Sequence, residues 1–310
     1  MDVGVVLNLT DRTPSIVDCA PALEERGLES VWLGEHTHLP VDSVFRYATG
    51  KYAKGNKARD GYVPDFYKRM PDPYVSLAAV ASTTTRLGLG TCIALPAEHN
   101  PIELAKRIAT LDTISGGRFL FGIGYGWNPL EMRNNGFEYA DRRVVLREKI
   151  SAMKALWTQE TAGFEGEHVR FTESWSYPKP AAKPHPPILL GAAPVKATFE
   201  DVVAFADGWI PVRAFVGDRL GEHIGELHRT AVEAGRDPAT IQISLVDSEG
   251  AMGGKKSREE FAARLPRKED LQRYAETGVS RVILGAPATD LDFYNWSLDR
   301  LAELRDSLAA

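Results

Sequence analysis

The stretch GGRFLFGIGYGWNP, residues 116–129, contains a complete transition from a strand to a helix. A Gly-Gly turn leads into a short apolar strand, the strand ends in three alternating glycines and a tryptophan, and Asn128-Pro129 then begins a helix. Glycines at the end of a strand allow a flat ring or a phosphate to approach the backbone. The stretch therefore predicts either the floor of a cofactor site or a glycine-rich turn without a ligand.

The same alternation recurs along the whole chain. Unbroken apolar runs, typical of strands buried on both faces, occur at residues 3–9, 30–33, 86–95, 118–123, 187–190, 208–212, 241–246 and 281–284. Helical patterns follow them at residues 15–26, 73–84, 101–114, 142–157, 196–206, 218–234, 268–277 and 290–307. Eight such units predict an α/β protein, a (β/α)8 TIM barrel that forms a single domain over residues 1–310. An open doubly wound sheet is the alternative.

Two connections are longer than ordinary loops. Residues 37–69 leave the second strand at the catalytic face of a barrel, which predicts a lid. The lid's basic residues either steer an anionic cofactor tail or form a solvated surface: Lys51, Lys54, Lys57 and Arg59. Residues 160–186 precede the fifth strand and predict a hairpin nearer the bottom face, with a structural role or a contact between subunits.

Composition narrows the functional classes. The 310 residues carry a net charge of −5, which argues against a nucleic-acid surface. Cys19 and Cys92 lack metal-ligand spacing and suit a reducing compartment. No apolar run approaches the ~20 residues of a membrane span, and no leader pattern is present. We therefore expect a cytoplasmic protein that binds neither nucleic acid nor membranes.

The second strand runs into Glu35 and His36, at the end of the barrel where catalysts lie. An imidazole donates or accepts a proton near neutral pH, so His36 could do so at a reacting centre, and we expect Glu35 to orient it. The His-X-His spacing with His38 also raises a metal site. The later strand ends carry no further ligands and His185 lies at the wrong end, so we predict no metal site.

Small residues end two other strands. Thr91, Cys92 and Ile93 suit a backbone packed against a flat ring, next to Gly124 and Gly126 at the end of the fourth strand. The fifth strand continues into residues 191–193 (Gly191, Ala192 and Ala193), whose N–H groups at the start of a helix could bind a phosphate or form a plain turn. His99-Asn100 precedes another helix and either holds an anion or caps it. Because Trp127 replaces the last glycine of a dinucleotide fingerprint, we exclude that motif.

Together these residues resemble the luciferase-like monooxygenase superfamily, and within it the oxidoreductases that use coenzyme F420. The resemblance is carried by SVWLGEH at 30–36, RLGLGT at 86–91, NP at 100–101 with LAK at 104–106, LD at 111–112 with SGGR at 115–118, GIG at 122–124 with GW at 126–127, PPI at 186–188 and ADGW at 206–209. It implies a TIM barrel with F420 or FMN across its C-terminal mouth, in a homodimer. It also implies that His36 is an active-site histidine, that the Cys92–Ile93 peptide is cis and supports the deazaflavin ring, and that Gly191 and Ala192 amides meet the cofactor phosphate.

Two positions depart from the family pattern. Trp127 stands where the sugar-phosphate dehydrogenases of this group carry a catalytic acid, and Glu98 precedes His99 where relatives often have a basic residue. The function expected is hydride transfer between F420 and a small organic substrate. His36 moves the proton, while Trp127 and the lid exclude water. An FMN-dependent monooxygenase that uses O2 and a non-catalytic F420- or flavin-binding protein are the alternatives.

Overall fold

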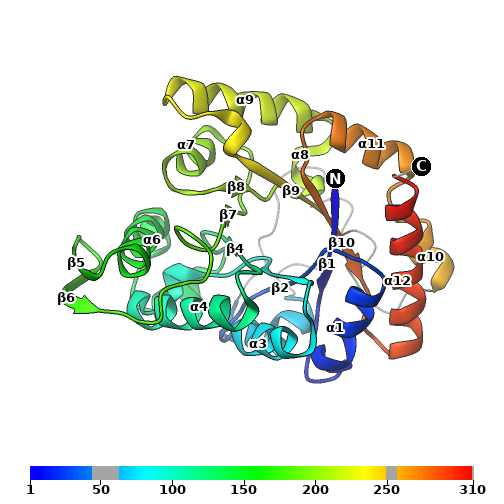
Figure 1. The fold of residues 1–310 in the computed structure, drawn as a ribbon, viewed down its shortest axis with the longest axis horizontal. Helices are drawn as coiled ribbons and strands as arrows, with labels where there is room; N and C mark the ends of the chain where they lie inside the picture. The colour runs from blue at the N-terminus through cyan, green and yellow to red at the C-terminus, as the bar shows by residue number, and fades with distance from the viewer. Residues whose placement is uncertain (44–62, 249–256, 309–310) are drawn as a thin grey trace.

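The computed structural model describes residues 1–43, 63–248 and 257–308. Within these ranges eight parallel strands close a barrel in the order β1-β10-β9-β8-β7-β4-β3-β2 (Figure 1). In chain order they are β1 (Asp2–Leu7), β2 (Ser30–Leu33), β3 (Gly88–Thr91), β4 (Phe119–Ile123), β7 (Ile188–Leu190), β8 (Gly208–Trp209), β9 (Gln242–Asp247) and β10 (Arg281–Ala286). The TIM barrel is confirmed, and the open-sheet alternative is wrong because β1 pairs with both β2 and β10.

Helices surround the barrel, as Figure 1 shows. The long ones are α1 (Ile16–Glu25), α3 (Pro73–Thr83), α4 (Pro101–Ser115), α6 (Arg142–Thr158), α7 (Lys196–Phe205), α9 (Leu220–Glu233), α11 (Lys268–Glu276) and α12 (Leu291–Asp306). Short ones lie in the connections: α5 (Pro129–Asn134), α8 (Arg213–Val216), α10 (Arg258–Ala262) and the 3-10 turns η1 (Asp65–Arg69), η2 (Pro96–Glu98), η3 (Tyr139–Asp141), η4 (Gly217–Arg219) and η5 (Pro238–Thr240). No helix in the described ranges is long and apolar enough to cross a bilayer.

Local signals in the sequence set the helix ends. The Asp72 side chain accepts from the N–H of Val75 and caps α3. Asn100 accepts from the first turn of α4, so its role is capping rather than anion binding. Asn128 accepts from the N–H of Leu130 at 3.1 Å and thereby begins α5 directly after β4. Each cap fixes where the chain leaves the barrel.

Strand register brings the functional loops to one level. Leu33 of β2 pairs with Thr91 of β3, so residues 34–36 and 92–93 leave neighbouring strands side by side. Ile123 of β4 pairs with Leu190 of β7, which places Gly124 beside Gly191. The barrel interior below is filled around Trp32, which is fully buried. A Cβ at Gly90 would lie 2.2 Å from that indole, so glycine there makes room for it. The open space is thereby confined to the C-terminal mouth.

The expected hairpin is present as β5 (Thr161–Glu165) and β6 (Arg170–Trp175), an antiparallel pair. It extends outward beside α6, away from the barrel (Figure 1). The Glu148 carboxylate of α6 accepts from the N–H groups of Glu167, His168 and Val169. The hairpin therefore starts directly after the end of α6, and its turn is held partway along that helix; its place nearer the bottom face stays a prediction.

Candidate active site

A cavity of about 220 Å³ opens at the C-terminal mouth of the barrel. Its wall includes eight of the residues predicted from the sequence: Glu35, His36, Cys92, Ile93, Trp127, Gly191, Ala192 and Ala193. Thr91, Gly124 and Gly126 do not line it. The rest of the wall is mostly apolar and comes from Val6, Asn8, Gly34, Phe66, Tyr67, Met70, Leu95, Ile210, Val212, Phe215, Val246 and Ser248. Apolar walls with few polar groups are typical of cofactor and substrate sites.

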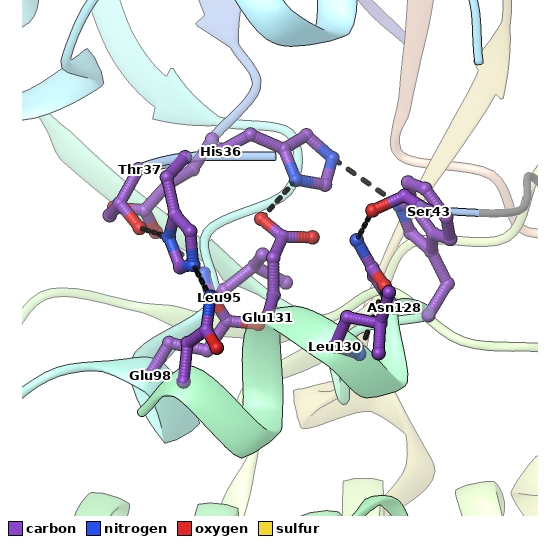
Figure 2. A network of polar contacts seen from close by, with 12 residues as sticks. His36, Thr37, Ser43, Leu95, Glu98, Asn128, Leu130 and Glu131 are labelled. Atoms are coloured by element: carbon purple, nitrogen blue, oxygen red, sulfur yellow. Dashed lines mark hydrogen bonds and ion pairs between the residues drawn. The ribbon is translucent and has the colours of Figure 1, made fainter. Parts of the chain in front are cut away.

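His36 is held from both of its nitrogens. Its Nδ1 lies 2.8 Å from Oε1 of Glu131, a fully buried side chain on α5. The indole Nε1 of Trp127 donates to Nε2 of His36 at 3.3 Å. Figure 2 shows Glu131 pointing toward His36 from the helix that follows β4. Two residues from the connection after β4 therefore fix one side chain from the end of β2.

These partners determine the tautomer of His36. An indole N–H is only a donor, so Nε2 must offer its lone pair to Trp127. Nδ1 then carries the proton, which it donates to the Glu131 carboxylate. A carboxylate behind a neutral imidazole stabilises the imidazolium that forms when the other nitrogen takes up a proton. The geometry therefore equips Nε2 to accept a proton at the wall of the cavity.

Aromatic rings cover His36. Tyr67 packs edge to face on the imidazole with 5.1 Å between ring centroids, and Trp127 does so at 5.5 Å. Phe66 stacks on Tyr67. As a result, only 5% of the His36 side chain is exposed. The cover keeps bulk water away from Nε2.

Glu35 does not orient His36, contrary to our expectation. Its Oε1 lies 2.7 Å from Nε2 of His99, and its Oε2 accepts from the N–H of Leu95 at 2.7 Å. Tyr74 donates a long hydrogen bond, 3.5 Å, to the same Oε2. Glu35 therefore fixes residues 95–99 against the barrel, and Glu131 takes the role predicted for it.

With this geometry in place, comparison with known proteins identifies the family. The family model of luciferase-like monooxygenases matches residues 7–248. The chain belongs to this family. An uncharacterized protein of Mycobacterium tuberculosis is 38% identical over 303 residues, which cover 97% of this chain and 98% of that protein.

Two further relatives carry named activities. An F420-dependent glucose-6-phosphate dehydrogenase of Amycolatopsis mediterranei is 30% identical over 188 residues, 59% of this chain and 49% of that enzyme. An FMNH2-dependent dimethylsulfone monooxygenase of Pseudomonas putida is 35% identical over 118 residues, 37% of this chain and 32% of that enzyme. This luciferase-like protein is thus related to oxidoreductases of both cofactor types.

Solved structures agree on the fold. The monooxygenase RslO1 of Streptomyces bottropensis superposes with a TM-score of 0.78 at 20% identity and covers 100% of both chains. An F420-dependent secondary alcohol dehydrogenase gives a TM-score of 0.70 at 17% identity and covers 99% of this chain and 98% of its own. At these identities the likeness establishes the luciferase-like barrel alone.

The floor of this luciferase-like cavity is made by Ile93 rather than by bare glycines. The Cys92–Ile93 peptide is cis, as the family resemblance implies. A Cβ at Gly124 would lie 2.8 Å from the Ile93 side chain, and one at Gly191 would lie 2.4 Å from it. A Cβ at Gly126 would meet Met132 at 2.6 Å. These glycines therefore leave space for the side chains of Ile93 and Met132. We expected Gly124 and Gly126 to face the cofactor ring, but they act on the shape of the cavity only through these side chains.

Thr91 and Cys92 also have structural roles. The Thr91 hydroxyl donates to the carbonyl of Gly122 at 2.7 Å and is fully buried, so it joins β3 to β4 behind the floor. Burial raises the pKa of the Cys92 thiol to about 12. A thiol that stays protonated is a poor nucleophile. Cys92 therefore contributes shape to the cavity and no covalent chemistry.

The residues before α7 divide into two kinds. The N–H of Gly191 donates to the carbonyl of Ile123 at 2.7 Å, so the phosphate contact expected from Gly191 has no free donor. Within the described chain, the N–H groups of Ala192 and Ala193 have no hydrogen-bond acceptor, and α7 begins without a side-chain cap. Free donors at a helix start favour a phosphate. An apolar floor beside such donors fits a flat ring that carries a phosphate.

Part of the predicted lid is described. The 3-10 turn η1 is tied to the loop after β1, because Arg69 contacts both Asp65 and Asp11 at 2.9 Å. This turn carries Phe66 and Tyr67 over His36. The four basic lid residues, Lys51, Lys54, Lys57 and Arg59, lie outside the described residues.

The metal alternative finds no support in the described residues. They contain no group of three or more His, Cys, Asp or Glu side chains that could hold an ion. His38 is exposed and bonded to Thr37 and Asn134, and His185 bonds the carbonyl of Pro186. Neither histidine lines the cavity.

Glu131 is the functional residue that sequence reasoning missed. It lies in the first turn of α5, where an acidic residue is ordinary, and 95 residues separate it from His36. The one available signal was its place in the apolar segment PLEM directly after the strand end.

Proposed function

We propose that this luciferase-like protein is an oxidoreductase that transfers a hydride between coenzyme F420 and a small organic substrate. The observation that carries the proposal is His36, a residue of the cavity wall whose Nδ1 is bound to buried Glu131 and whose Nε2 accepts a 3.3 Å hydrogen bond from Trp127. A proton must accompany hydride transfer to or from an alcohol or a carbonyl. His36 is the group at the cavity wall best placed to carry it.

Different residues of the chain have different roles in the proposed reaction. Ile93 would support one face of the cofactor ring, and the amides of Ala192 and Ala193, which have no acceptor within the described chain, would hold its phosphate. When bound, the deazaflavin supplies the carbon that takes or gives the hydride. In oxidation, Nε2 of His36 accepts the substrate's proton while Glu131 stabilises the resulting imidazolium; in reduction the same nitrogen returns it. Trp127 and Tyr67 exclude water from this step.

The cavity wall favours an uncharged substrate. Among the described residues that line it, none is Lys or Arg, and the one acidic side chain, Glu35, is committed to His99 and Leu95. A sugar phosphate needs cationic partners in its site. Together with Trp127 at the family's acidic position, this supports an alcohol or a ketone with an apolar body.

An FMN-dependent monooxygenase is the second candidate. It is supported by the 35% identity to the FMNH2-dependent dimethylsulfone monooxygenase of Pseudomonas putida. Both cofactors combine a flat ring with a phosphate, so the floor and the amides of Ala192 and Ala193 suit either.

Titration of the purified protein with F420 and with FMN separates these candidates. We expect saturable binding of F420, weaker binding of FMN, and reduction of F420 by members of a panel of secondary alcohols. Binding of FMN alone, with oxygen consumption, would support the monooxygenase. Binding of F420 without turnover of any substrate would support a carrier.

The variant His36→Ala tests the mechanism. Turnover falls by roughly 10²-fold or more while F420 affinity is kept, because general acid–base catalysis contributes about that much. His38→Ala is the matched control, since this exposed histidine lies two residues away and outside the cavity. Equal turnover in the two variants removes His36 from the reaction.

A further inference from the structure

A buried carboxyl cluster lies behind His36, and the proposed reaction gives one of its members, Glu98, no role. Glu98 ends η2, Glu131 lies on α5, and Glu35 follows β2. Glu131 is fully buried and Glu98 is 8% exposed. Figure 2 includes Glu98 and Glu131 in the same polar network as His36. Three acids in one buried region cannot all ionise cheaply.

Two oxygens of this cluster lack partners. Within the described residues, Oε1 of Glu98 and Oε2 of Glu131 are buried and accept no hydrogen bond. The other oxygen of Glu98 accepts a long bond, 3.4 Å, from the amide of Asn135. A buried carboxylate oxygen without a donor is costly, whereas a protonated carboxyl is not. The geometry therefore favours a proton on one of these two acids.

Glu98 is the better site for that proton. Glu131 faces it from α5, Glu35 from the end of β2 and Lys149 from α6; His99 follows it in the chain and is bonded to Glu35. Lys149 donates to the carbonyls of Ala97 and His99 rather than to Glu98. Burial, then the charges of Glu131 and Glu35, raise the pKa of Glu98 to about 9. Glu131, by contrast, has the imidazole N–H of His36 to stabilise its charge.

We propose that Glu98 is a positioning residue: a neutral carboxylic acid that leaves the negative charge of the acid pair on Glu131 and so keeps the proton of His36 on Nδ1. The inference rests on the proposed role of His36. The pair carries one proton over the neutral range, and this proton does not enter the reaction. If Glu131 held it instead, its carboxyl would no longer stabilise the imidazolium at His36.

The test follows the ring nitrogens of His36 by ¹⁵N NMR in cofactor-free protein. In the wild type, we expect the Nδ1–H tautomer at pH 7 and a second change in the ring signals near pH 9, when Glu98 ionises beside Glu131. Glu98→Gln, which mimics the neutral acid, should leave the signals at pH 7 unchanged and abolish the change near pH 9. Glu103→Gln, an exposed site on α4, is the matched control and should retain it.

Three results would overturn the proposal. One is a wild-type titration without a change near pH 9, which requires no variant to fold. Another is persistence of that change in Glu98→Gln. The third is a shift of the His36 signals at pH 7 in that variant, which would mean that Glu98 is charged there. None of these results changes what is expected of the cofactor titration or of His36→Ala. The proposed function is therefore tested separately from this inference.

Stability gives a second readout with a definite sign. The pKa of Glu98 is about 9 in the folded protein and 4.5 in its ordinary state, so the folded protein binds the extra proton between these pH values. The free energy of unfolding therefore falls as pH rises through this window, and Glu98→Gln should remove this loss. A pH dependence of the urea midpoint that is identical in wild type and variant would contradict a neutral Glu98.

Discussion

Two histidine–carboxylate pairs are built from the adjacent residues Glu35 and His36, yet they differ in which of their atoms have hydrogen-bond partners. In the pair His36–Glu131 the contact is 2.8 Å, and in His99–Glu35 it is 2.7 Å. Glu35 uses both oxygens, on His99 and on the N–H of Leu95. Glu131 has one oxygen without a partner among the described residues, and the far nitrogen of His36 accepts a long bond, 3.3 Å, from Trp127.

The comparison shows that a buried histidine–carboxylate pair is not in itself a catalytic site. The pair His99–Glu35, in which both carboxylate oxygens accept hydrogen bonds, stabilises the loop that follows β3. The pair His36–Glu131 lies at the cavity wall, and its Nε2 is held by Trp127 at the longer distance of 3.3 Å, so this nitrogen is the one suited to move a proton. The role of such a pair depends on the surroundings of those histidine and carboxylate atoms that do not join the two residues.

The largest expected contrast comes from removing each imidazole. His36→Ala lowers turnover by roughly 10²-fold or more, whereas His99→Ala changes it by less than about threefold. His99→Ala instead lowers the free energy of unfolding by about 1–3 kcal/mol, because an oxygen of buried Glu35 loses its donor. Steady-state kinetics and urea unfolding measure the two effects. Similar losses of turnover would show that both pairs serve the reaction.

A smaller contrast comes from neutralising each acid. Glu131→Gln should lower turnover by about tenfold, because an amide stabilises the imidazolium less well than a carboxylate. Glu35→Gln should leave turnover nearly unchanged and lower the free energy of unfolding by about 1–2 kcal/mol. Full turnover in Glu131→Gln would mean that its charge does not assist His36.

The smallest expected effect comes from the second partner of His36. Trp127→Phe keeps most of the aromatic cover and removes the indole donor to Nε2. A hydrogen bond between neutral groups contributes about 0.5–1.5 kcal/mol, so turnover should change by about two- to tenfold. Steady-state kinetics across a range of pH gives the profile of kcat/KM for both proteins. A profile that matches the wild type would assign Trp127 to packing alone.

Much of the fold follows from local pattern in the sequence. Strands buried on both faces appear as unbroken apolar runs, and caps such as Asp72 and Asn100 mark the helices between them. The pattern predicts some strands to be longer than they are. Residues 208–212 are uniformly apolar, yet only Gly208–Trp209 forms β8. Periodicity detects burial, while strand length depends on which backbone groups find partners across the barrel.

The site was only partly predictable, because its contacts cross the chain. The strand-end rule located His36 and Trp127 correctly at the cavity. The predicted partner of His36 was wrong. Glu35 was expected because it precedes His36 in the sequence, but successive residues point in different directions. Glu131 approaches from α5, 95 residues away. Gly124 predicted room for a flat ring and Gly191 predicted a phosphate contact, but no pattern in the sequence showed that Ile93 occupies the space beside both.

The contact of Ile93 with Gly124 and Gly191 has an evolutionary consequence. Three positions on three different strand ends share one volume, so they cannot change independently. In any lineage that introduces alanine at 124 or 191, residue 93 must become smaller or turn aside. Positions 93, 124 and 191 should therefore covary among relatives, and the size of residue 93 should record how deep each family member's cavity is.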